Sequence, residues 1–319
     1  MKKKLILSIL IFFILLAIII SPQTYIKVSM SAIEVWAKVL LPGLFPFFVF
    51  TKLLTSLGYV KQISKGFSTI TYKLYKTPPI SSYIFFMSIL TGYPVGSKLT
   101  ADLYNSNAIS RLDAKKCITF TSNSGPMFIV GSVGIGMLFS VEAGYIILIS
   151  HILGALLNGL LYRNLKSKQN EIKQINYSLD DKDTSLSSCV MDSVYSILLI
   201  GGIVVVAFII IELLNNLHIF NPIIYVLSQI GINPEFSSSV ISGFFEITKG
   251  CLMTSSLNTS LYLKTVLSSA IISFGGISTT LQSMAFLKDI VSYRFFILQK
   301  ITHMIFTVII CAIIGFILL

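Results

Sequence analysis

Apolar runs of membrane-spanning length alternate along the chain with short polar segments. The runs over 31–54, 143–162, 191–214 and 301–319 each predict a spanning helix, because crossing a bilayer takes about 20 apolar residues. A shorter run over 5–20 follows three consecutive lysines. It predicts a first membrane helix that is retained, and a signal peptide is the alternative.

Four further apolar regions are interrupted by glycine or small polar residues. The regions 81–104 and 236–257 have arms too short to cross, and they predict two re-entrant hairpins. The regions 117–138 and 261–287 are long enough but break at 122–126 and 273–278, which predicts two broken helices. Irregular backbone at membrane depth is tolerated where it is buried in protein or lines a wet cavity. The interruptions therefore predict a cavity inside the protein.

The interruptions repeat along the chain. Segments 92–98 and 243–249 share the form Gly-aromatic-x-x-x-x-Lys and begin 151 residues apart. The same offset relates the breaks, Ser122 to Ser273 and Gly125 to Gly276. The sequence thus predicts an N-terminal helix and loop (1–30), a first repeat (31–162), a hydrophilic linker (163–187) and a second repeat (188–319).

Counting crossings gives the orientation of the repeats. If each hairpin enters and leaves on one side, each half crosses three times, so the halves are inverted relative to one another. The predicted fold is an all-α integral membrane protein with about seven transmembrane helices, two re-entrant hairpins and two broken helices.

Composition and charge agree with a membrane protein. Of 319 residues, 54% are hydrophobic and 12% charged, where a soluble domain carries about 25% charged residues. The net charge of +11 does not indicate a nucleic-acid partner, because the basic residues lie in short loops. With a cytoplasmic N-terminus, 18 of the 24 lysines and arginines fall in the inside segments 1–4, 55–80, 105–116, 163–187 and 288–300. The positive-inside rule supports this orientation and an outside C-terminus.

Two connections have a character of their own. Segment 55–79 predicts a loop with an interfacial amphipathic helix. Segment 215–235 predicts an outside loop, and it holds no lysine or arginine.

The hairpin lysines, Lys98 and Lys249, are the first candidates for function. A charged side chain at membrane depth costs about 2.5–3.5 kcal/mol and needs a partner. A negatively charged substrate is one such partner. Asp102 and Glu246, each on the same helical face as one of these lysines, are the structural alternative.

The breaks supply the remaining candidates. Half-helix termini inside a bilayer attract ions, anions at free N–H groups and cations at free carbonyls. The alternative is close helix packing through small residues. Aromatic side chains at the hairpin glycines favour stacking on a planar ligand or plain packing. The predicted substrate-binding residues are Gly92, Tyr93, Pro94, Ser97, Lys98, Ser122, Asn123, Ser124, Gly125, Glu246, Thr248, Lys249, Gly275, Gly276, Ser278 and Thr279.

The sequence gives no sign of an enzyme. The four cysteines and three histidines are scattered, without the spacing of a zinc site. No phosphate loop, His-Glu-x-x-His or local Ser/His/Asp motif occurs, so we expect no catalytic residues, cofactor or metal. The expected partners are the lipid bilayer and a small anionic solute, while a coupling ion and homo-oligomerisation stay open.

Several motifs resemble a known family. The segments 41–48, 91–98, 122–128 with 131–134, and 243–250 look like those of YlbJ-type sporulation integral membrane proteins. That family carries nucleoside-recognition ("Gate") repeats, similar to those of concentrative nucleoside transporters. The resemblance implies transport of dipicolinic acid, a planar dianion, from mother cell to forespore across the outer forespore membrane.

Two alternatives to an organic-anion transporter remain. A nucleoside transporter fits the repeat type, with Glu246 and Asn123 as partners for ribose hydroxyls. A sporulation membrane scaffold is the alternative from another class, with 163–187 as its surface.

Overall fold

The computed structural model describes residues 2–166 and 185–319, and within these ranges the regular secondary structure is entirely helical. Most of the predicted linker 163–187 lies outside the described residues. The first half runs α1 (Lys2–Ile20), α2 (Pro22–Val35), η1 (Trp36–Leu40), α3 (Leu41–Ser56), α4 (Tyr59–Tyr75), α5 (Ser81–Thr91), α6 (Val95–Asn105), α7 (Arg111–Thr121), η2 (Met127–Ile135) and α8 (Val141–Tyr162).

The second half repeats this order of elements. It runs α9 (Leu186–Asn216), α10 (Asn221–Gln229), α11 (Pro234–Phe245), α12 (Ile247–Ser255), α13 (Leu261–Phe274), α14 (Gly276–Leu287) and α15 (Tyr293–Leu318). Each half therefore has a long helix, a short helix, a hairpin of two short helices, a helix broken in the middle and a closing helix. The predicted hairpins and both predicted breaks are present.

Two predicted helix starts and one predicted loop were wrong. The predicted helix 31–54 begins at Pro22, a residue whose fixed φ suits a first helical turn, and it runs without interruption to Ser56. The π-helical segment η1 ends two residues before Pro42 and accommodates the missing N–H of this proline. The last span begins at Tyr293, where the Ser292 side chain caps the helix by accepting from the Phe295 N–H. The loop predicted over 215–235 contains α10.

Five helices of the described chain are long and apolar enough to cross a membrane. They are Pro22–Ser56, Val141–Tyr162, Leu186–Asn216, Leu261–Leu287 and Tyr293–Leu318. The segment 117–138 is divided between α7 and η2, which are too short to count singly. The number of seven crossings stays a prediction.

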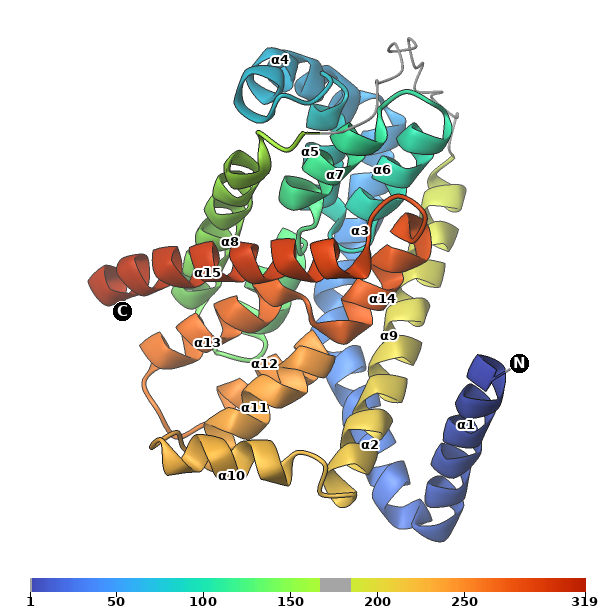
Figure 1. Ribbon diagram of the computed structural model, residues 1–319, viewed down its shortest axis with the longest axis vertical. Coiled ribbons are helices and arrows are strands. Elements are labelled where there is room, and N and C mark those ends of the chain that lie inside the picture. Colours follow the sequence, from blue (N-terminus) through green and yellow to red (C-terminus); the bar gives the residue numbers. More distant parts are fainter. Residues whose placement is uncertain (1, 167–184) are drawn as a thin grey trace.

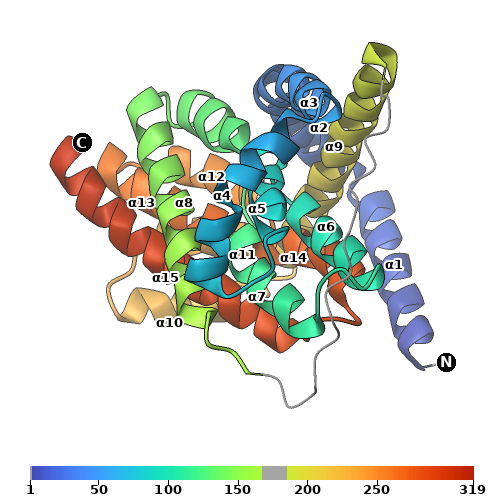
Figure 2. The same cartoon turned by 90° about the horizontal axis from the view of Figure 1, so that it is seen from above.

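The halves point in opposite directions. Figure 1 shows α4 and the hairpin α5–α6 at one end of the molecule and α10 and the hairpin α11–α12 at the other. Both hairpins project towards the middle. The helix α1 stands at the edge, beside α2 and α9, in both views (Figures 1 and 2).

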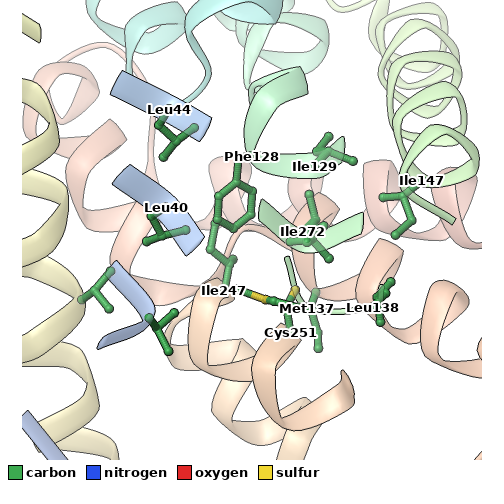
Figure 3. Close-up of a cluster of buried hydrophobic side chains, with 14 of the residues drawn as sticks. Leu40, Leu44, Phe128, Ile129, Met137, Leu138, Ile147, Ile247, Cys251 and Ile272 are labelled. Carbon is green, nitrogen blue, oxygen red and sulfur yellow. The ribbon is translucent and has the colours of Figure 1, made fainter. Parts of the chain in front are cut away.

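The apolar core joins the halves. One cluster of buried side chains draws on α2, η1, α3, η2, α8, α9, α12 and α13. Figure 3 shows its centre, where Phe128 lies among Leu40, Leu44, Ile247 and Ile272. Burying a side chain of this size stabilises the fold by about 1.5–3 kcal/mol. The core therefore fixes the broken helices of both halves against the long helix α2–α3.

Candidate functional site

The four backbone interruptions meet in the middle of the protein. A Cβ built on Gly92, at the first hairpin tip, would lie 2.7 Å from the Gly125 nitrogen in the first broken helix. A Cβ on Gly276, in the second broken helix, would lie 3.0 Å from the Gly243 carbonyl oxygen of the second hairpin. The Tyr93 ring carbon Cζ lies 3.5 Å from the position that a Cβ on Gly275 would take. This contact links the first hairpin tip to the second broken helix. The 2.7 Å approach to backbone requires glycine at position 92.

A cavity opens where the interruptions meet, with about 700 Å³ of open space including its mouth. Apolar side chains of α3, η2 and α9 form its walls, among them Phe47, Phe48, Phe128 and Ile203. Its polar part comes from the interruptions. Half of the predicted site residues line it: Gly92, Tyr93, Ser124, Gly125, Glu246, Thr248, Ser278 and Thr279.

Four helix N-termini begin at this cavity. The helices α6, η2, α12 and α14 start within a few residues of its lining. The first turns of α6, η2 and α14 have no side-chain cap. Uncapped N-termini present N–H groups and the positive end of the helix dipole. The three uncapped N-termini thus contribute positive potential to the cavity.

The fourth N-terminus is capped by Glu246. One Glu246 carboxylate oxygen accepts from the Lys249 backbone N–H at 2.8 Å, and the other accepts from the Thr248 hydroxyl at 3.0 Å. The side chain is 4% exposed and belongs to the cavity lining. The dipole of α12 stabilises this carboxylate, which is the one acidic group among the described lining residues.

The hairpin lysines lie away from the cavity. Lys98 is exposed, and Lys249 stands over the Phe208 ring with 4.5 Å between its Nζ and the ring centroid. In the described residues, Lys98 makes no ion pair with Asp102, and Lys249 makes none with Glu246. The internal ion pairs weighed for these lysines are therefore not formed among the described residues, and contact with a substrate stays a prediction.

The other predicted residues belong to the hairpins and breaks but do not line the cavity. Pro94 follows Tyr93 through a cis peptide bond, and Ser97 is buried on α6. Asn123 donates to the Phe120 carbonyl at 2.8 Å. The hydroxyl of Ser122 and the side-chain oxygen of Asn123 are buried without a hydrogen-bond partner in the described structure. Gly275 and Gly276 have φ of +86° and +67°, the left-handed region that favours glycine.

The prediction missed Lys300. This residue was counted among the inside loops, but it lies on α15 and is 1% exposed. Its ammonium donates to the Tyr93 hydroxyl at 2.5 Å and to the Ser122 carbonyl at 3.0 Å. The sequence offered little signal for it, because Lys300 sits at the edge of an apolar run with no counterpart in the first repeat.

The prediction also missed His151. The Ser124 N–H donates to His151 Nε2 at 3.0 Å, and His151 Nδ1 lies 2.9 Å from the Ser273 hydroxyl. His303 Nε2 donates to the His151 carbonyl at 3.0 Å. His151 and His303 are 152 residues apart, close to the repeat offset of 151. Aligning the closing helices of the two repeats would have revealed this pair.

Comparison with known proteins gives one informative match. No family model matches the chain, and no solved structure was found to match it. The sporulation integral membrane protein YlbJ of Bacillus subtilis (strain 168) is 28% identical over 305 residues, which cover 87% of this chain and 74% of the relative. The match confirms the expected resemblance to the YlbJ-type sporulation integral membrane proteins.

Proposed function

We propose that this protein carries a small organic anion across a membrane during sporulation. The convergence of four helix N-termini on one cavity, three of them without a side-chain cap, supports this proposal most directly. Backbone N–H groups at such termini bind carboxylates well. The inverted halves, with irregular backbone at their interface, are typical of alternating-access transporters.

Dipicolinate is the substrate that we propose, and the outer forespore membrane is the proposed location. The family resemblance indicates both. The cavity agrees in chemistry, because a planar aromatic dicarboxylate needs donors for its carboxylates and apolar surface for its ring. Phe48 and Phe128 supply such surface, and the hairpin tips and breaks supply the donors.

Uptake into proteoliposomes tests this function. Purified protein should give dipicolinate uptake above that of protein-free vesicles, and Ser278→Phe should block it, because Ser278 lines the cavity. Ser228→Phe, on α10 at the far end of the molecule, is the matched control and should transport normally. Equal uptake by both variants would remove this cavity from the transport path.

A nucleoside is the second candidate substrate, and Glu246 favours it. A buried carboxylate in the cavity wall is a natural partner for ribose hydroxyls. Competition separates the candidates. If uridine blocked uptake, and benzene dicarboxylates did not, the nucleoside would replace the anion as substrate.

A further inference from the structure

Lys300 is a buried basic residue with no carboxylate beside it in the described chain. The side chain is 1% exposed, and no aspartate or glutamate of the described chain forms an ion pair with it. An ammonium has three N–H donors. Two are used, by the Tyr93 hydroxyl and the Ser122 carbonyl, and the third has no partner among the described residues. Both acceptors are neutral, so no group of the described residues compensates a positive charge on Lys300.

Lys300 does not line the cavity itself but contacts Tyr93, which does. Tyr93 lines the cavity and has the ammonium 4.6 Å from its ring centroid. The Lys300 carbon Cε is 3.4 Å from the position that a Cβ on Gly275 would take, at the start of α14. The same helix start places Ser278 and Thr279 in the cavity wall. Tyr93 and Gly275, which has no side chain, are thus what stands between the ammonium and the cavity.

We propose that Lys300 is the cation that recognises a carboxylate of the substrate, and that Tyr93 covers it until the substrate arrives. The inference rests on the proposed anion transport and gives that site its charged residue. A substrate carboxylate takes the place of the Tyr93 hydroxyl on the ammonium, and the phenol ring moves aside from the first hairpin tip. Binding at Lys300 then loosens the contact between this tip and the Ser122 break.

The structural alternative is a plain latch, in which Lys300 holds Tyr93 and Ser122 together and takes no part in binding. Two substitutions separate these roles. Lys300→Gln and Tyr93→Phe both remove the lysine–tyrosine hydrogen bond. A latch predicts similar losses for both variants. If Lys300 binds the substrate carboxylate, the two variants should have opposite effects on substrate binding. Lys300→Gln removes the positive charge, whereas Tyr93→Phe keeps it and removes the hydroxyl that competes with the carboxylate.

The test measures binding and uptake of three probes that differ in charge: dipicolinate, picolinate and neutral picolinamide. We expect Lys300→Gln to raise the KM for dipicolinate by about tenfold to hundredfold, the loss typical of a hydrogen bond to a charged group. Binding of picolinamide should stay unchanged, so the preference for charge disappears. Tyr93→Phe should bind dipicolinate at least as tightly as the wild type, and Lys300→Arg should keep the preference for charge.

Lys116→Gln is the matched control. Lys116 is also buried, at 8% exposure, but its Nζ faces the Lys76 carbonyl at 3.4 Å, away from the cavity lining. It should keep the wild-type ranking of the three probes. If Lys300→Gln failed to fold, Tyr93→Phe and Lys300→Arg would still decide, because loss of dipicolinate binding in Tyr93→Phe overturns the proposal.

The outcomes also separate this inference from the proposed function. Wild-type uptake of dipicolinate with an unchanged preference for charge in Lys300→Gln would overturn the role of Lys300 and leave the transporter. Wild-type uptake of uridine without any uptake of the carboxylates would overturn both.

Discussion

His151 lies at the point where the two broken helices come together. The Ser124 N–H can only donate, so Nε2 is the accepting, unprotonated nitrogen of the ring. The proton therefore sits on Nδ1, which donates to the Ser273 hydroxyl. One neutral imidazole on α8 thus joins the first break to the second, and the structure assigns its tautomer.

Replacing this imidazole should loosen both breaks. In His151→Asn the shorter side chain cannot reach both partners, and a buried N–H or hydroxyl left unpaired costs about 1–3 kcal/mol. We expect a lower thermal unfolding temperature for the detergent-purified variant. His218→Asn is the control, because His218 is exposed on the turn between α9 and α10. Equal unfolding temperatures for His151→Asn and the wild type would contradict the assigned role.

Glu246 separates the candidate substrates by the sign of one effect. For an anionic substrate, Glu246→Gln removes a like charge from the cavity wall and should lower the KM by roughly threefold to thirtyfold. The amide oxygen of glutamine still accepts from the Lys249 N–H, so the α12 cap is kept in part. For a nucleoside, the same change removes a hydroxyl acceptor and should raise the KM.

Measuring the KM of Glu246→Gln for dipicolinate and for uridine in proteoliposomes shows whether the KM falls or rises. Glu235→Gln, an exposed change near the start of α11, is the control and should alter neither KM. A higher KM for dipicolinate in Glu246→Gln would count against the anion.

Individual lysines show where sequence reasoning stops. Lys98 and Lys249 stood out because they recur with the hairpin glycines, yet one is exposed and the other lies over an aromatic ring. The spacing of residues places a lysine near a turn but does not say which way its side chain points. Lys300 has its main partners 207 and 178 residues away in sequence, a proximity that no local pattern encodes.

Gly201 allows α9 to pack closely against the Trp36 indole of the first long helix. The Trp36 indole N–H donates to the Ile197 carbonyl at 2.9 Å, and a Cβ on Gly201 would lie 2.8 Å from Nε1 of the same indole. The neighbouring Gly202 has no such contact within 4 Å. The two glycines thus face a packed and an open side of one helix.

Leucine at each of these positions gives a matched pair. Gly201→Leu should force the indole away from α9 and destabilise the fold by about 1–3 kcal/mol, the typical effect of overpacking. Gly202→Leu should be neutral or slightly stabilising, because leucine is the better helix former. Thermal unfolding in detergent compares them, and equal losses would contradict the packing of Trp36 on Gly201.

Elements were more predictable than contacts. The hairpins and breaks followed from glycine and polar residues inside apolar runs, a local signal that the repeat offset strengthened. Helix boundaries failed where polar residues continue a helix, as at Arg294 and Lys300 in the first turns of α15. The interruptions predicted a cavity inside the protein. The contacts that bring four of them together join elements far apart in sequence, and no local pattern encodes those contacts.

The two ends of the molecule differ in their content of basic residues. The end with α4 and the α6–α7 turn carries basic residues, among them Lys61, Lys65 and Lys115, while α10 at the opposite end contains neither lysine nor arginine (Figure 1). The positive-inside rule predicts that the basic end lies in the cytoplasm. Because Lys300 is buried in the protein, the number of basic residues in the predicted inside segments falls by one. Most lysines and arginines still belong to those segments.

Cysteine labelling tests this orientation, and the protein is suited to it. All four native cysteines are buried, so an impermeant maleimide should give little background. Gln62→Cys places a thiol on an exposed position of α4, and Gln229→Cys places one at the end of α10. In intact cells of a heterologous bacterial host, only Gln229→Cys should react, and Gln62→Cys should react after the membrane is made permeable. The reverse pattern would invert the protein and, with it, the side from which each hairpin enters. Labelling of both thiols in intact cells would mean that α4 and α10 lie on one side, which the inverted arrangement of the halves does not allow.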